Sequence, residues 1–342
     1  MNAKSRHSLL VGTLAAGLGS LLWRRYRADL RLARERVAQG SRLASTACGP
    51  IEFAEAGRGL PLLVVHGAGG GFDQGMELAG SLPQRGFRVI AMSRFGYLRT
   101  PLPANASAAA QADAHACLLD ALGIWQAAIM GVSAGAPSAM QFAIRHPERC
   151  RALVLMVPLS YRPPELAASA PPKSPGSEKA LTTIVSSDFA FWLASKVARE
   201  SLIEMVLGTP AQVVRSATAE ERARIDRLIE DILPISQRAD GLLNDGRIAT
   251  ALPRYELERI TAPTLILSAR DDLYGTFASA QYTATQIPHA SFVGFKAGGH
   301  ILADHDEETS TRIQAFLSSV GTDATSGAVP PDVVKRAAGN KA

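Results

Sequence analysis

The chain has 342 residues, 47% of them hydrophobic, and a formal net charge of +5. This length and composition are enough for one large domain or two smaller ones with a buried core. Residues 1–36 hold eight basic and two acidic side chains, so the rest of the chain is close to neutral. The sequence therefore offers no basic face of the kind that binds nucleic acid.

An uncharged and mostly apolar segment, residues 8–23, lies near the amino terminus between basic residues. As a helix it would rise about 24 Å, somewhat less than the roughly 30 Å hydrocarbon core of a bilayer. Trp23 and the following arginines are typical of a membrane boundary. We predict that residues 1–41 form a single-pass membrane anchor and a linker helix, with the remaining chain on the cytoplasmic side. A cleaved signal peptide and a soluble amphipathic extension are the alternatives.

The next segments predict strands of a central sheet. Residues 48–55 are expected to form an edge hairpin with the strand before them, and residues 61–65 a buried strand that ends in the glycine-rich loop 66–71. Such a loop can turn backbone N–H groups toward developing negative charge. A phosphate-binding loop is excluded, because neither a following Lys-Ser/Thr pair nor complete G-x-G-x-x-G spacing is present. We expect His66 to make structural hydrogen bonds rather than to act as a base.

Residues 87–92 predict a further core strand, and the loop that follows it should border a pocket. Four residues of the two loops are candidates for lining an acyl site: Gly67, Phe72, Phe95 and Tyr97. Simple packing is the alternative role for the three aromatic side chains.

A serine lies at the centre of the pentapeptide Gly131-Val132-Ser133-Ala134-Gly135. The apolar run 127–130 before it predicts a buried strand, and residues 134–146 after it predict a helix. Strand, tight turn and helix around Gly-x-Ser-x-Gly are the context of a nucleophile elbow. The strained turn would expose the hydroxyl group at the positive end of a helix.

Residues 152–156 predict another strand, after which the pattern changes. From Leu159 to Pro253 the sequence is rich in proline at first and then helical, with no strand pattern. We predict a helical insertion over 161–250, which divides the core into 42–160 and 251–320. Residues 321–342 are small and polar and predict a disordered tail.

Two more chemistry-bearing residues follow predicted strands near the carboxyl end of the chain. Asp271 and Asp272 follow the strand 264–268, and His300 follows the strand 291–295 in Gly298-Gly299-His300. Because ligands collect at the carboxyl ends of strands in open α/β sheets, we expect the serine, an aspartate and the histidine to converge there.

The remaining motifs suggest neither a metal nor a disulfide. Cys48, Cys117 and Cys150 form no C-x-x-C pair, and we expect the last two to be core thiols without structural disulfides. The acidic run 304–308 is interpreted as a helix start rather than a metal site. No metal and no cofactor are predicted.

Taken together, these motifs resemble those of the α/β-hydrolase superfamily, of the type that carries a helical cap. The resemblance covers about residues 48–318. It rests on four motifs in this order: His66-Gly67-Ala68-Gly69, Gly131 to Gly135, the Asp271-Asp272 pair and Gly298-Gly299-His300. It implies an α/β fold with a mainly parallel central sheet, flanked by helices and interrupted by the helical insertion.

The resemblance also implies roles for individual residues. Ser133 would be the nucleophile, His300 the general base, and Asp272 the acid that orients the imidazole. Asp271 is the alternative acid, since the family's Gly-x-x-Asp pattern can be aligned on Ala269 or on Ser268. The backbone N–H groups of two alanines, Ala68 and Ala134, would form the oxyanion hole.

The substrate is left more open than the chemistry. An apolar cap suggests a small, mostly apolar ester, thioester or lactone. Carbon–carbon bond hydrolysis of vinylogous diketones is the alternative, since hydrolases of that kind resemble the same architecture. A non-catalytic binding protein on the same fold is a second alternative.

Overall fold

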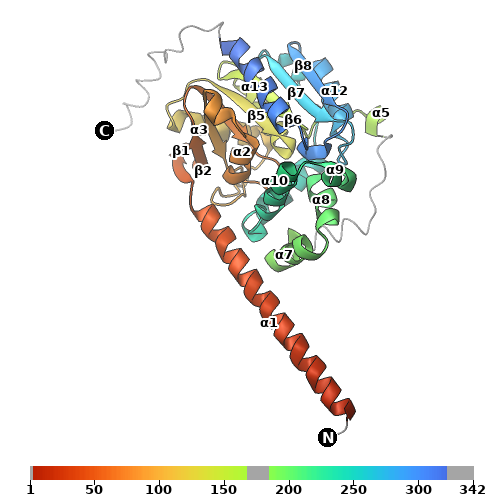
Figure 1. Ribbon diagram of the computed structural model, residues 1–342. Helices are drawn as coiled ribbons and strands as arrows, with labels where there is room; N and C mark the ends of the chain where they lie inside the picture. Colours follow the sequence, from red (N-terminus) through yellow and green to blue (C-terminus); the bar gives the residue numbers. More distant parts are fainter. Residues whose placement is uncertain (1–2, 168–184, 322–342) are drawn as a thin grey trace, which may run out of the picture.

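The computed structural model describes residues 3–167 and 185–321 (Figure 1). Residues 322–342 of the predicted tail lie outside the described residues. The described chain forms a central sheet with helices on both faces, a group of helices inserted between two of its strands, and one long amino-terminal helix.

The central sheet has eight strands in the order β1-β2-β4-β3-β5-β6-β7-β8. The pairs β1–β2 and β2–β4 are antiparallel and all other neighbours are parallel. This confirms the predicted α/β-hydrolase fold. The strands are β1 Arg42–Thr46, β2 Gly49–Ala56, β3 Leu60–Val65, β4 Phe87–Met92, β5 Ala127–Val132, β6 Cys150–Met156, β7 Thr264–Ala269 and β8 Ala290–Phe295.

Both faces of the sheet are covered because its central strands are apolar on both sides. Along β3, Leu63 and Val65 pack into one hydrophobic core, and Leu62 and Val64 into another. The first core includes side chains of α3 (Ala108–Ala121), α4 (Ala136–Arg145) and α12 (Thr276–Gln286). The second includes side chains of α13 (Asp306–Gly321) and of the region of α2 (Phe72–Leu78).

The chain between β6 and β7 is helical in its described residues, 157–167 and 185–263, and contains no strand there. We call this insertion the cap. It has a third hydrophobic core of its own, which includes Phe191, Trp192 and Ile225. Its helices are α5 Pro164–Ala167, α7 Asp188–Val197, α8 Arg199–Leu207, α9 Ala211–Ser216, α10 Ala219–Glu230 and α11 Ala239–Thr250.

Five short 3₁₀ turns complete the described structure. One of them follows β5 directly, one is separated from the end of β8 by three residues, and the other three lie in connecting segments. They span Leu82–Arg85, Ser133–Gly135, Ile235–Gln237, Leu257–Arg259 and Gly299–Ile301.

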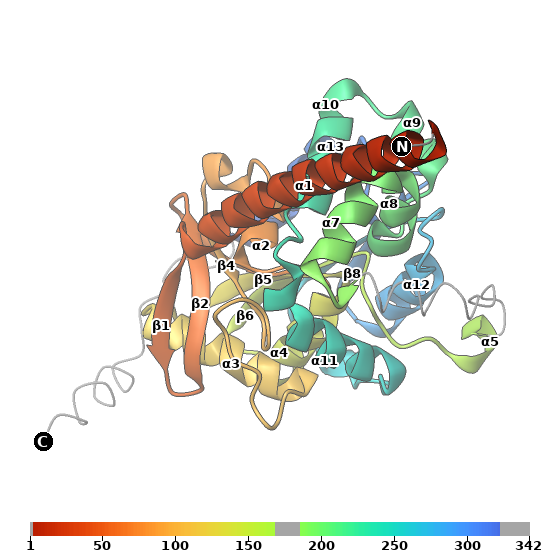
Figure 2. The same ribbon diagram turned by 90° about the horizontal axis from the view of Figure 1, so that it is seen from below.

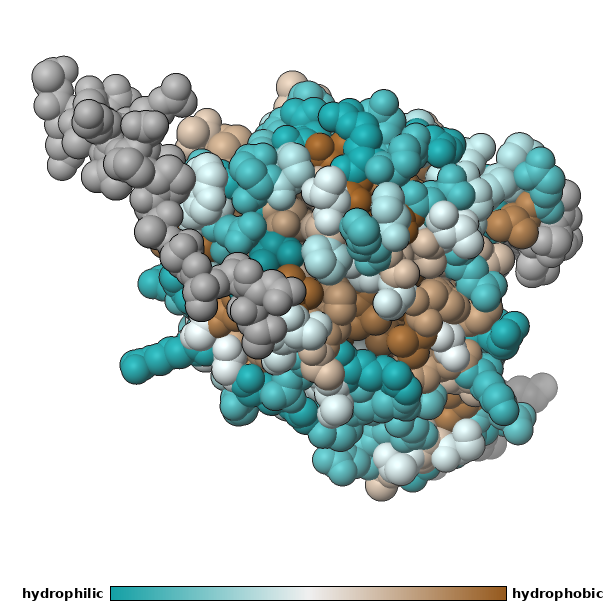
Figure 3. Space-filling model, turned by 90° about the horizontal axis from the view of Figure 1, so that it is seen from above, coloured by the Kyte–Doolittle hydropathy of each residue, from teal (hydrophilic) through white to brown (hydrophobic). Residues whose placement is uncertain are grey.

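The amino-terminal segment is one helix, α1 (Ala3–Ala38), which projects from the body of the protein and runs past α7 (Figures 1 and 2). Its second half joins the cap core through Tyr26, Leu30 and Ala33. The indole N–H of Trp192 also donates to Asp29 at 2.8 Å. Seen from the side opposite α1, the surface is largely hydrophilic around a central apolar area (Figure 3).

The predicted membrane anchor over residues 8–23 is wrong. In the part of the chain that the structure describes, no helix combines the length and the apolar character needed to span a bilayer. The physical reason is that the apolar run is short and continues directly into Arg24, Arg25 and Arg27 within the same helix. The cytoplasmic placement of the remaining chain was inferred from that anchor, so it loses its support as well.

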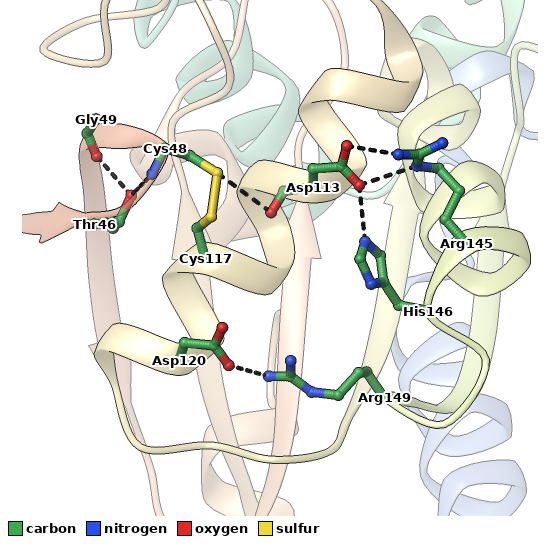
Figure 4. The surroundings of a disulfide bond; sticks show 9 residues. All are labelled: Thr46, Cys48, Gly49, Asp113, Cys117, Asp120, Arg145, His146 and Arg149. Atoms are coloured by element: carbon green, nitrogen blue, oxygen red, sulfur yellow. Dashed lines mark hydrogen bonds and ion pairs between the residues drawn. A yellow bond between two sulfur atoms is a disulfide. The ribbon is translucent and has the colours of Figure 1, made fainter. Parts of the chain in front are cut away.

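The expectation that the cysteines form no disulfide is also wrong. Cys48, in the turn between β1 and β2, is bonded to Cys117 of α3 with a Cα–Cα distance of 6.0 Å (Figure 4). The two cysteines are 69 residues apart, so their spacing alone could not indicate that the edge hairpin lies against this helix. Cys150 is a free, buried thiol, as predicted.

Candidate active site

Ser133 lies in a strained turn at the carboxyl end of β5. Its φ angle is +49°, which is unfavourable for a residue with a side chain. The glycines on either side leave room for the turn. A Cβ atom on Gly131 would lie 2.6 Å from Cβ of Ala139, and one on Gly135 would lie 2.4 Å from the carbonyl oxygen of Val65. The predicted strand, turn and helix are therefore present, and the glycines are required by close backbone approach.

Three predicted residues from distant parts of the chain meet at this turn. The His300 imidazole lies with Nε2 2.8 Å from Ser133 Oγ and with Nδ1 2.8 Å from Asp272 Oδ2. Asp272 also accepts hydrogen bonds from the N–H of Tyr274 and the hydroxyl of Thr276. Burial by itself raises the pKa of Asp272, but His300 and these donors outweigh it and leave that pKa below its usual value. An ionised Asp272 accepts a hydrogen bond from Nδ1–H, which keeps the proton on that nitrogen and leaves Nε2 free to accept the proton of the serine.

Asp271, the alternative acid, makes different contacts. Its carboxylate accepts the backbone N–H groups of Gly298 at 3.1 Å and Gly299 at 2.9 Å. It therefore supports the loop that carries His300, while Asp272 is the carboxylate that contacts the imidazole.

Ala68 has a free backbone N–H group on the glycine-rich loop, next to Gly67. Within the described segments of the chain, this N–H donates no hydrogen bond, whereas those of its neighbours are occupied. The N–H of Gly67 donates to Gln74 at 3.0 Å and that of Gly69 to the hydroxyl of Tyr97 at 3.3 Å. A free donor on this loop is what an oxyanion hole requires.

The second predicted donor, Ala134, is the second residue of the 3₁₀ turn Ser133–Gly135, where the first N–H groups lack intrahelical acceptors. The two loops are adjacent because Val65 of β3 is in register with Gly131 of β5. A Cβ atom on Gly67 would lie only 3.2 Å from Cβ of Ser133. Both candidate donors thus lie on segments that meet at the serine.

His66 contacts the glycine loop but is separate from the serine. It is fully buried, and its Nε2 accepts the N–H of Arg94 at 3.0 Å. The proton must then be on Nδ1, which donates to the Gly67 carbonyl at 2.7 Å. Burial, together with the charge of Arg94, holds the pKa of His66 well below its usual value. A neutral imidazole with both nitrogens occupied has the structural role expected for it.

The aromatic residues predicted to line an acyl site lie in different places. Phe95 and Ala134 line the same small internal cavity. Tyr97 is buried, and its hydroxyl bonds both Asp245 and the N–H of Gly69. Phe72 is buried too, with its N–H bonded to Ser93. An acyl-binding role for these residues stays a prediction.

Sequence reasoning missed a contact between the cap and the histidine. The carbonyl of Gly208, at the end of α8, accepts the N–H groups of Leu273 at 2.9 Å and His300 at 3.3 Å. The ring of Tyr274 lies edge-on to the imidazole, with 4.8 Å between centroids. The only available signal was a glycine at the end of a helical pattern, which normally indicates just a helix C-cap.

Sequence reasoning also missed the buried charges around the glycine loop: Asp73, Arg94, Arg238 and Asp245. Charged residues are normally expected at the surface, both in the core, where Asp73 and Arg94 lie, and in the helical insertion, where Arg238 and Asp245 lie. The sequence therefore carried no signal for them. Within residues 3–167 and 185–321, no group of three or more histidine, cysteine, aspartate or glutamate side chains is placed to hold a metal ion.

The fold and the site define a class of protein, and comparison with known families agrees with it. The family described as "alpha/beta hydrolase fold" matches residues 61–306, and the chain belongs to this family. It is therefore a hydrolase by family.

Individual relatives are more distant or match only in part. The chain is 44% identical over 128 residues to a 2-hydroxymuconate semialdehyde hydrolase of Pseudomonas putida, a match that covers 36% of this chain and 43% of the relative. It is 27% identical over 282 residues to the uncharacterized hydrolase YcgS of Bacillus subtilis, with 79% and 96% covered. An alpha/beta hydrolase fold protein from Nakamurella multipartita superposes with a TM-score of 0.66 at 29% identity, with 82% and 99% covered.

Proposed function

We propose that this chain is a serine hydrolase that cleaves a small, mostly apolar ester, thioester or lactone through an acyl-enzyme intermediate. The observation that carries the proposal is the pair of 2.8 Å contacts that link Ser133, His300 and Asp272. These distances lie within the range of productive nucleophile–base and base–acid hydrogen bonds.

The proposed reaction has two halves. Ser133 Oγ attacks the substrate carbonyl carbon while His300 Nε2 takes the hydroxyl proton, and the N–H groups of Ala68 and Ala134 stabilise the oxyanion. The intermediate collapses, and the leaving group departs with the proton from His300. Water, deprotonated by His300, then hydrolyses the acyl-enzyme and regenerates the serine.

A second candidate is hydrolysis of a carbon–carbon bond in a vinylogous diketone. The observation that favours it is the 44% identity over 128 residues to a protein named 2-hydroxymuconate semialdehyde hydrolase. A protein named 2-hydroxy-6-oxo-6-phenylhexa-2,4-dienoate hydrolase, from Comamonas testosteroni, is also 34% identical over 113 residues. Both matches cover less than half of the relative, so this candidate stands second.

Labelling with a fluorophosphonate probe tests the proposal. We expect the wild-type chain to be labelled, Ser133→Ala to be unlabelled, and Ser45→Ala, an exposed serine of β1, to be labelled like the wild type. Absence of labelling in folded wild-type protein would contradict the proposal and favour a non-catalytic binding protein.

Substrate assays separate the two candidates. We would compare p-nitrophenyl esters of graded acyl length with 2-hydroxy-6-oxohexa-2,4-dienoates at equal enzyme concentration. The ester proposal predicts a higher kcat/KM for an ester, whereas the reverse order would support the carbon–carbon bond hydrolase.

A further inference from the structure

The loop of residues 67–71, here called the oxyanion loop, is held in place largely by side chains from elsewhere in the chain. Its Gly67 carbonyl accepts a hydrogen bond from Arg94 Nη2 at 3.1 Å, and its Gly69 N–H donates to the hydroxyl of Tyr97. Its Gly70 carbonyl accepts one from Arg238 Nη1. The three contacts thus hold residues on both sides of Ala68, whose own N–H is free.

Two of these three contacts depend on one carboxylate of the cap. Asp245, in α11, accepts hydrogen bonds from both terminal nitrogens of Arg94, at 2.7 Å each, and from the hydroxyl of Tyr97 at 2.5 Å. The side chains of Arg94 and Asp245 are only 5% and 6% exposed. Burial alone would lower the pKa of Arg94, but Asp245 raises it above its usual value. The pair is thus a bidentate ion pair shielded from water.

The third contact comes from the cap directly. Arg238, which is 0% exposed, lies between the 3₁₀ turn Ile235–Gln237 and α11. It donates to the Gly70 carbonyl and pairs with Asp73 at 2.7 Å. Asp73, in the first turn of α2 just after the oxyanion loop, also pairs with Arg36 of α1. Burial by itself raises the pKa of Asp73, but Arg238 and Arg36 outweigh it and hold that pKa at about 2. Asp73 is therefore charged at neutral pH.

A loop with four glycines in five positions has wide conformational freedom when it is unsupported. An oxyanion donor works only when it is held within about 0.5 Å of the productive position. The loop has few side chains with which to fix itself, so groups outside it must supply the order. Two of those groups, Arg94 and Tyr97, are buried side chains of the core that Asp245 of the cap holds in place. The third, Arg238, is a buried side chain of the cap itself.

We propose that Asp245 and Arg238 of the cap are positioning residues, which fix the oxyanion loop so that the Ala68 N–H points at the developing oxyanion. The cap then forms part of the oxyanion hole's support as well as covering the site. This inference rests on the proposed serine hydrolase function.

The test compares binding of a transition-state analogue with binding of a neutral ground-state analogue in full-length protein. A trifluoromethyl ketone forms a hemiketal oxyanion with the serine, and the corresponding secondary alcohol does not. In Asp245→Asn, which keeps the side-chain shape but removes the charge, we expect kcat and affinity for the ketone to fall by about 10- to 100-fold. The affinity for the alcohol and KM should stay close to wild type.

Because Asp245→Asn leaves Arg94 buried and unpaired, it could prevent folding. The double variant Arg94→Met/Asp245→Leu removes both charges and keeps the interior apolar, so it retains the fold while releasing the loop. It should show the same selective loss. Arg149→Met is the matched control, since it removes a buried arginine that bonds Asp120 and the Trp125 carbonyl, away from the loop. Its kcat and ketone affinity should equal those of the wild type.

Two results would overturn the positioning role. One is wild-type kcat and ketone affinity in the folded double variant. The other is an equal loss of affinity for ketone and alcohol, which would indicate general loosening of the pocket. Failure of the proposed function has a different signature, because the fluorophosphonate probe would then not label the wild-type protein.

Discussion

The two halves of the candidate site are held in different ways. Ser133, Asp272 and His300 follow three parallel strands and contact one another directly. The cap reaches this half mainly through uncharged groups, such as the carbonyl of Gly208 and the hydroxyl of Thr209. One arginine of the cap, Arg224, also donates to the carbonyl of Ile301 beside the histidine. The oxyanion loop follows a fourth strand and has few side chains of its own, and the cap holds it through buried charges.

This difference shows how the fold divides the work. Side chains at the carboxyl ends of adjacent parallel strands are brought together by the sheet itself. A backbone N–H on a glycine-rich loop is not, because its direction depends on φ and ψ angles that glycine leaves free. The proposed triad therefore depends mainly on the core, and the proposed oxyanion hole depends on the core and the cap together.

The largest effect is expected from the acid of the triad half. Asp272→Asn should lower kcat by about 10⁴-fold, because the amide cannot hold the His300 tautomer that accepts the serine proton. Asp271→Asn should have a much smaller effect, since its carboxylate bonds only the N–H groups of Gly298 and Gly299. Steady-state kinetics with the best ester substrate would compare kcat in the two variants and show which aspartate is the acid. A larger loss in Asp271→Asn would reverse the assignment.

The disulfide should contribute to the stability of the fold without affecting catalysis by either half of the site. Cys48 and Cys117 are 69 residues apart, so Cys48→Ser/Cys117→Ser should lower the free energy of unfolding by about 4 kcal/mol through the entropy of the unfolded chain. Urea unfolding with and without a reducing agent measures it.

In that experiment the wild type should respond to the reducing agent and the double variant should not, while kcat stays unchanged in both. A tenfold loss of kcat in the folded double variant would show that the edge hairpin supports the site, contrary to a purely structural role for the disulfide.

The contact of the cap with the triad half can be broken at Gly208. Its φ angle is +52°, and a Cβ atom there would lie 2.7 Å from the ring of Tyr274 and 3.1 Å from Cβ of His300. Gly208→Ala should displace the imidazole and lower kcat by about 10²-fold.

Gly246→Ala is the control for Gly208→Ala, since Gly246 lies in α11 with open space around it. It should leave kcat unchanged and stabilise the cap by about 1 kcal/mol, as alanine does in a helix. Equal kinetics in the two alanine variants would show that the triad half is independent of the cap.

The smallest effect concerns the charge that supports the oxyanion half. The pKa of Asp73 is about 2 in the folded chain, against an ordinary value of 3.8. A lowered folded-state pKa means that the unfolded chain binds the proton more readily. The contribution to stability, about 2 kcal/mol, is therefore present above pH 4 and lost as the pH falls toward 2.

Urea unfolding between pH 6 and pH 2 would measure this contribution, with Asp73→Asn as the comparison. The variant should be less stable than the wild type at pH 6, and the difference should narrow below pH 4. A difference that is constant with pH would show that Asp73 acts without its charge.

Local patterns in the sequence determined much of this protein. Apolar runs and glycine turns predicted the core strands, their parallel arrangement and the family, and they placed Ser133 and His300 at strand ends. These features depend on residues close together in the chain, where periodicity and turn chemistry are read directly. The same reasoning left Asp271 and Asp272 open, since adjacent residues share the same local pattern.

Only the tertiary structure decided the rest. It selected the aspartate that contacts the imidazole and paired Cys48 with Cys117. It packed the second half of α1, which follows the predicted anchor, on the cap. It also joined Arg94 to Asp245 across 151 residues of sequence. Such pairings follow from which surfaces the folded layers bring together, and no local property of either residue encodes its partner.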